Sequence, residues 1–126
     1  MAAPIERLKQ RSEFLRVAAT RQKWVTPGLI LQAAARPAQA EQDAEFDSSP
    51  FRIGYTASRK VGNAVQRNRA RRRLRAAVAE VMTSRASEGW DYVLIARRQT
   101  LGRPYGDLLA DLEGALAGLT AKAGSQ

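Results

Sequence analysis

Three segments of the chain carry the apolar patterns of β-strands. Residues 51–58 alternate apolar side chains with small, polar or basic ones, which predicts a strand with one apolar face. Residues 29–34 alternate in the same way after the Pro27-Gly28 turn signal. Residues 92–96 are apolar without interruption, which is typical of a strand inside a sheet. The chain therefore contains the strands of a small sheet.

Three other segments have apolar residues at helical spacing. They are residues 5–20, 65–85 and 104–119. Ser12 is an alternative start for the first helix, because serine is a good N-cap. The tail 120–126 is small and polar, so we expect it to fray.

The order of these elements predicts one α+β domain over residues 1–126. Helices would cover one face of a sheet of about four strands. The other face, with Gly54, Thr56 and Ser58 on it, would remain open to a partner. Residues 36–50 read as a flexible acidic loop, because they hold two prolines and four carboxylates, with no base between Glu41 and Asp47.

Positive charge is concentrated in one segment. Nine of the 21 Lys and Arg residues lie between Asp47 and Glu80, where no acidic residue occurs. The rest of the chain balances 12 bases with 12 acids, so the net charge of +9 comes from this segment. A solvated helix face usually mixes signs, whereas a focused excess attracts a phosphate backbone. The charge pattern predicts nucleic-acid binding.

The residue inventory excludes most protein-based catalysis. The chain has no cysteine and no histidine, so thiolate sites, disulfides and the usual general base are absent. A Ser58–Lys60 dyad lacks an oxyanion-hole motif, and the acidic loop lacks the glycine and bidentate glutamate of a calcium loop. We therefore expect no catalytic residue and no protein-held metal. No membrane span or signal segment is visible, which predicts a cytoplasmic protein.

Arginine dominates the basic segment, and its planar fork suits phosphate oxygens and base stacking. Gly62 would let the backbone approach a ligand, next to the free N–H groups of a helix N-terminus. Only Phe14, Tyr55 and Trp24 are available as stacking platforms. Core packing is the alternative for each of them, and for Trp24 it is the favoured one.

Residues 52–75 closely resemble the signature of the bacterial ribonuclease P protein component. The segment reads RIGYTASRKVGNAVQRNRARRRLR. The family shows a strand, then Ser-basic-Lys-Val-Gly, then Ala-Val-x-Arg-Asn-Arg and a basic helix. The resemblance continues in Arg7-Leu-Lys, in Glu13-Phe-x-x-Val17 and in Tyr92-Val-Leu-Ile-Ala-Arg97, and it covers most of residues 5–119.

The resemblance implies a ribosomal-protein-S5-domain-2-like, two-layer α/β sandwich with a left-handed βαβ crossover. Its partners would be the catalytic RNA of ribonuclease P, one protein to one RNA, and precursor tRNA, whose 5′ leader is removed. The RNA with bound Mg²⁺ would perform the hydrolysis. The residues assigned to the catalytic RNA are Ser58, Arg59, Lys60, Asn63, Arg67, Asn68, Arg69, Arg71, Arg72, Arg73 and Arg75. Those assigned to a leader cleft between the first helix and the sheet are Arg11, Phe14, Val17 and Tyr55.

Two features depart from the family pattern. A second aromatic expected one helical turn after Phe14 is Ala18, and the acidic insertion after Pro37 is longer than usual. Two other functions remain open. One is a structural or ribosome-associated RNA-binding protein without a processing role. The other is a stand-alone nuclease, which would need carboxylates near the basic segment.

Overall fold

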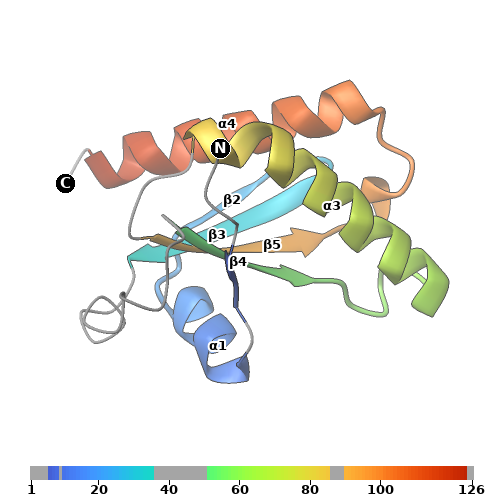
Figure 1. Cartoon of the computed structure of the whole chain (residues 1–126), viewed down its shortest axis with the longest axis horizontal. Helices are drawn as coiled ribbons and strands as arrows, with labels where there is room; N and C mark the ends of the chain where they lie inside the picture. The colour runs from blue at the N-terminus through green and yellow to red at the C-terminus, as the bar shows by residue number, and fades with distance from the viewer. Residues whose placement is uncertain (1–5, 9, 36–50, 86–89, 125–126) are drawn as a thin grey trace.

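A computed structural model describes residues 6–8, 10–35, 51–85 and 90–124 (Figure 1). The elements in chain order are β1 (Glu6–Arg7), α1 (Arg11–Ala19), β2 (Lys23–Val25), β3 (Leu29–Ala35), β4 (Phe51–Thr56), α3 (Ala64–Arg85), β5 (Trp90–Ala96), the 3₁₀-helix η2 (Arg98–Thr100) and α4 (Tyr105–Gly124). No helix within these ranges is long and apolar enough to cross a membrane. The predicted acidic loop 36–50 lies outside the described residues.

The strands form one mixed sheet in the order β1-β4-β5-β3-β2. β4 pairs in parallel with β1 and with β5, whereas β3 pairs antiparallel with β5 and with β2. Helix α3 connects the parallel neighbours β4 and β5, which gives the predicted βαβ crossover. β3, β4 and β5 match the three predicted strands, and the short strands β2 and β1 bring the sheet, predicted to have about four strands, to five.

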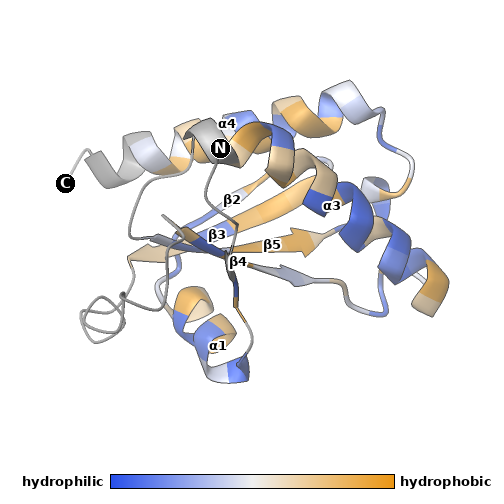
Figure 2. Ribbon diagram, in the orientation of Figure 1, coloured by the Kyte–Doolittle hydropathy of each residue, from blue (hydrophilic) through white to orange (hydrophobic). Residues whose placement is uncertain are grey.

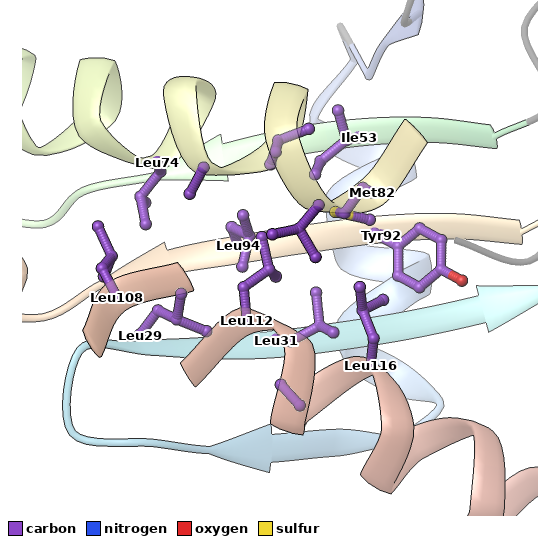
Figure 3. Packing of buried hydrophobic residues seen from close by; sticks show 14 of the residues in the cluster. Leu29, Leu31, Ile53, Leu74, Met82, Tyr92, Leu94, Leu108, Leu112 and Leu116 are labelled. Carbon is purple, nitrogen blue, oxygen red and sulfur yellow. The ribbon is translucent and has the colours of Figure 1, made fainter. Parts of the chain in front are cut away.

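Helices α3 and α4 cover one face of the sheet, and this interface holds the main core (Figures 1 and 3). Leu31, Ile53 and Leu94 point from three strands toward Leu74 of α3 and Leu112 of α4, and all five side chains are fully buried. Apolar residues on one side of each element explain this layer, because their burial removes hydrocarbon surface from water.

Helix α1 lies on the opposite face of the sheet (Figure 1). It builds a second, smaller core from Leu8, Val17, Ala34 and Val93. The expectation of one fully open face is therefore wrong in part. Gly54 is buried beneath α1, where Phe14 occupies the space a side chain at residue 54 would need, since an added Cβ would lie 2.4 Å from two of its ring atoms.

Two helix boundaries also differ from the prediction. The first helix begins at Arg11 and not at residue 5, because Glu6 and Arg7 pair with β4 as strand β1. Its N-terminus is closed by Gln10, whose N–H donates to Glu13 Oε1 at 3.1 Å, so Ser12 is not the cap. At the other end, α4 continues to Gly124, which corrects the prediction that the chain frays directly after Leu119.

Candidate nucleic-acid interface

The turn before α3 is built to start the basic helix. Asn63 and Gln66 cap it reciprocally, because Gln66 N–H donates to Asn63 Oδ1 at 2.9 Å and Asn63 N–H donates to Gln66 Oε1 at 2.8 Å. Gly62 has φ 150°, and an added Cβ would lie 2.0 Å from Gln66 Oε1. Asn63 Oδ1 is committed to the cap, but its side-chain NH₂ lies at an exposed position, so its contact with RNA stays a prediction.

Four basic side chains around this turn project into solvent. Arg59 and Lys60 lie in the turn after β4, and Arg69 and Arg72 lie on the outer side of α3; all four are exposed. Within the described part of the chain, no hydrogen bond or ion pair holds their charged groups. Figure 2 shows the same region of α3 as a hydrophilic run after an apolar first turn. These side chains are available to an anionic partner.

Arg73 is used inside the protein, although the sequence suggested an RNA contact. Its guanidinium reaches sideways from α3 and donates to the carbonyl oxygens of Thr100 at 2.6 Å, Leu101 at 2.8 Å and Arg103. The side chain is half-buried. Because its donors close the loop between η2 and α4, its assignment to the RNA interface is corrected to a structural role.

The remaining predicted residues of α3 are partly held by their neighbours. Arg71 Nη1 donates to Asn68 Oδ1 at 2.9 Å, and Arg67 Nη1 donates to the Gly62 carbonyl at 3.4 Å. Asn68 is exposed, and Arg67 and Arg71 are half-buried. Their contact with RNA stays a prediction. Ser58 is exposed too, and its Oγ accepts the Lys60 N–H at 3.3 Å, which shapes the turn.

Tyr55 lies on the α3 face of the sheet, so its assignment to a leader site beside α1 is wrong. The alternation along β4 places it with Ile53, whereas Gly54 faces α1. The Arg75 guanidinium lies 5.9 Å from the centre of the Tyr55 ring, a cation–π geometry. Burial raises the pKa of Tyr55 to about 12, while Arg75 and Arg7 act to lower it. Tyr55 therefore orients Arg75 at the edge of the basic surface.

On the α1 side, Phe14 is half-buried over Gly54, Arg11 is exposed, and Val17 is fully buried. Val17 therefore belongs to the core and cannot contact a ligand directly, which corrects its assignment. Trp24 is 41% exposed and packs against Gly118 of α4, on the far face from Phe14. Trp24 belongs to neither core cluster, so its core packing stays a prediction.

A row of side chains crosses the sheet next to α1, and of its members the sequence analysis had placed only Thr56 on this face. Thr56, Ile95, Ile30 and Val25 are register partners on four neighbouring strands. Ile95 belongs to the core cluster under α1, which fixes this row on the same face as Phe14. Thr56 and Val25 are exposed and the two isoleucines half-buried. The row spans about 14 Å at the usual strand spacing. Its sequence signals were the even positions of residues 29–34 and the alternation of residues 51–58.

A buried carboxylate ties α1 to the sheet. Asp91 of β5 is fully buried and accepts from Arg52 Nε at 2.8 Å, from Arg52 Nη2 at 2.6 Å and from Arg16 Nη2 of α1. Arg52 Nη1 also pairs with Glu13 Oε2 at 3.0 Å, and Arg16 Nη1 donates to the Ala35 carbonyl at 3.1 Å. The negative charges of Asp91 and Glu13 offset the positive charges of Arg16 and Arg52. Arg52 therefore adds no net charge to the basic surface.

The described residues contain no group of three or more His, Cys, Asp or Glu side chains placed to hold a metal ion. The expectation that the protein holds no metal by itself stays a prediction. The predicted left hand of the β4–α3–β5 crossover and the assignment of residues 1–126 to one domain likewise stay predictions.

The fold and the exposed arginines of α3 define an RNA-binding α+β protein. A family profile described as Ribonuclease P matches residues 3–120. The chain belongs to the ribonuclease P protein family, whose members are the protein components of a ribonucleoprotein endoribonuclease that processes tRNA. Membership implies partnership with the ribonuclease P RNA.

Individual relatives agree with the family match. The chain is 60% identical to the ribonuclease P protein component of Paramagnetospirillum magneticum over 116 residues, which cover 92% of this chain and 84% of the relative. It is 49% identical to that of Gluconacetobacter diazotrophicus over 112 residues, with 89% of each chain covered.

Solved structures show the same fold at lower identity. The RNase P protein of Staphylococcus aureus aligns with a TM-score of 0.69 and 22% identity, covering 90% of this chain and 94% of that chain. The protein from Thermotoga maritima gives 0.67 and 19%, covering 86% and 93%. The predicted α+β sandwich is confirmed.

Proposed function

We propose that this protein binds the catalytic RNA of ribonuclease P and the 5′ leader of precursor tRNA, and so assists removal of the leader. The observation that carries the first part is the set of exposed bases Arg59, Lys60, Arg69 and Arg72 around the start of α3. They lie in a segment without any acid, so the surface attracts phosphate. One protein would bind one RNA in the cytoplasm.

The leader would lie on the α1 side of the sheet. Phe14 offers a half-buried ring beside the row from Thr56 to Val25, whose apolar side chains and width of about 14 Å suit two or three unpaired nucleotides. Because α3 and this row use opposite faces of one sheet, catalytic RNA and leader would bind without competing. The protein would then favour precursor tRNA, which has a leader, over the mature product.

The catalytic RNA would perform the cleavage. The chain has no histidine or cysteine, and residues 48–79 supply no carboxylate to act as a base or as a ligand for Mg²⁺. Mg²⁺ would therefore be held by the RNA, where it supplies charge neutralisation and an activated water. The exposed arginines would offset part of the phosphate repulsion that otherwise requires a high Mg²⁺ concentration.

Reconstitution tests this function. The protein, freed of co-purifying RNA, is added to the ribonuclease P RNA of the same organism at a Mg²⁺ concentration too low for the RNA alone. We expect leader removal from precursor tRNA to be restored. An unchanged Mg²⁺ requirement would contradict the proposal. Recovery of ribosomal RNA instead of ribonuclease P RNA in a pull-down would favour a ribosome-associated role.

The leader contact needs its own measurement. Replacing Phe14 with leucine is expected to weaken binding of precursor tRNA to the holoenzyme by about tenfold, the lower end of what one base–aromatic contact contributes. Mature tRNA has no leader, so its affinity stays the same. Leu15→Ala is the matched control, because Leu15 is an exposed neighbour on α1. Equal losses for precursor and mature tRNA would show that Phe14 serves only the core.

A further inference from the structure

The outer face of α3 is hollowed between Val65, Asn68, Arg72 and Arg75, an opening of about 450 Å³. These residues follow one another at helical spacing, so they form one stripe over about 15 Å of the helix. The hollow begins at Val65. Figure 2 shows the first turn of α3, where Val65 lies, as apolar. Its chemistry differs from a plain phosphate-binding surface, because one of its four residues is apolar.

Val65 is the residue that charge does not explain. It is 65% exposed, more than any other large hydrophobic side chain that the structure describes as exposed. Phosphate oxygens gain nothing from a neighbouring isopropyl group. The flat face of a base and the carbon side of a ribose do gain from such a contact. In an unpaired nucleotide both expose apolar surface, and contact with Val65 removes it from water.

The polar groups of the hollow all present donors. Asn68 Oδ1 already accepts from Arg71 at 2.9 Å, so the amide NH₂ of Asn68 is the end left for a ligand. Arg72 and Arg75 carry only N–H donors. Arg75 is oriented by the Tyr55 ring, 5.9 Å from its guanidinium carbon. A donor-only site beside an apolar side chain suits an acceptor-rich base edge.

We propose that this hollow binds one unpaired guanine of the catalytic RNA, through donors to its N7 and O6 and through contact of Val65 with the nucleoside. Guanine is the base whose N7 and O6 are adjacent acceptors, and arginine pairs with both at once. The proposal rests on the function proposed above and refines it. The basic helix then recognises a base and does not only neutralise phosphates.

The first test compares variants of the hollow by affinity for the ribonuclease P RNA and by its salt dependence. Val65→Ser and Asn68→Asp are each expected to lose about tenfold, the size of one base contact. Val65→Ser should leave the slope of log affinity against log salt unchanged, because it removes no charge. Arg72→Lys should lose more RNA affinity than the control Arg69→Lys, because Arg72 lines the hollow and Arg69 does not. Both variants keep their positive charge. Circular dichroism checks that each variant is folded.

The second test identifies the base. The RNA is transcribed with a small fraction of 7-deazaguanosine, which lacks N7, and protein-bound molecules are separated from free ones. We expect one guanine position at which the analogue weakens wild-type binding but has a smaller effect on Arg72→Lys, which lacks the fork that pairs with N7 and O6. The guanine site would be overturned if no such position were found, if Val65→Ser bound the RNA as tightly as wild type, and if the two lysine variants lost the same affinity. If the wild-type protein failed to bind the RNA at all, the proposed function itself would fail.

Discussion

Arginines serve opposite purposes beneath α1 and on the outer side of α3. Arg16 and Arg52 point at the buried Asp91, and Arg52 also pairs with Glu13, so their charge is neutralised inside the protein. Arg69 and Arg72 are exposed with no acid nearby in the described structure. The same side chain therefore holds α1 to the sheet in one region and stays available for a partner in the other.

The difference follows from geometry and from desolvation. Asp91 sits under α1, where an unpaired carboxylate would be costly, and two arginines compensate for it. On the outer side of α3 the arginines remain hydrated and repel one another, a cost that a polyanion relieves on binding. Removing an arginine should thus lower stability in the first region and RNA affinity in the second.

The largest expected effect is on stability, from Asp91→Ala. This variant leaves Arg16 and Arg52 facing a buried space without their acceptor, and we expect a loss of about 3 kcal/mol in the free energy of unfolding. Urea denaturation measures it. Asp107→Ala is the control, because Asp107 is exposed in the first turn of α4, and it should lose less than about 1 kcal/mol. Equal losses would show that the buried charge cluster does not hold α1.

Arg72 and Arg73 sharpen the comparison within one helix. Arg73→Met removes the donors to three backbone carbonyls, and we expect a loss of about 2 kcal/mol in the free energy of unfolding. Arg72→Met should leave stability within about 0.5 kcal/mol, because its side chain is exposed.

RNA affinity should reverse the order of these two variants. Arg72→Met should weaken binding to the catalytic RNA and lower its salt slope by roughly 0.7–0.9, whereas folded Arg73→Met should keep both. Filter binding at several salt concentrations checks this. If both variants shifted only affinity, the internal role of Arg73 would be refuted.

The sequence predicted the elements well where the pattern was long and periodic. Residues 65–85 gave α3 to within one residue, whereas 104–119 gave the start of α4 but stopped five residues before its end at Gly124. The three predicted strands were placed within two residues of their observed ends. The family signature also located the basic surface. Short elements failed, because the two residues of β1 and the three of β2 carry too little pattern to stand out.

Side-chain partners were the part that the sequence could not supply. Arg72 and Arg73 are the same residue type and adjacent in the chain. They point in different directions from α3, so only Arg73 reaches the loop after β5 and hydrogen-bonds to it, whereas Arg72 is exposed. Asp91 and Arg52 are 39 residues apart in sequence yet share two hydrogen bonds. Tyr55 was assigned to the wrong face because the position of α1 was not known. Gly54 did carry a signal, since glycine inside a strand often marks a close approach.

The smallest expected effect comes from that glycine and tests whether Phe14 is held where a leader would meet it. In Gly54→Ala the new methyl would lie 2.4 Å from two Phe14 ring atoms, so the ring or α1 must move. We expect a loss of about 1–2 kcal/mol in the free energy of unfolding, typical of overpacking, together with a smaller preference for precursor over mature tRNA.

Gly102→Ala is its matched control, because a Cβ at Gly102 meets nothing within 4 Å. The double variant Gly54→Ala with Phe14→Leu should be less destabilised than the sum of the two single variants, since the smaller side chain leaves room for the methyl group. Strict additivity in urea denaturation would mean that the ring does not depend on Gly54. In that case the α1 side of the sheet would owe its shape to the Asp91 cluster and to the apolar core around Val17.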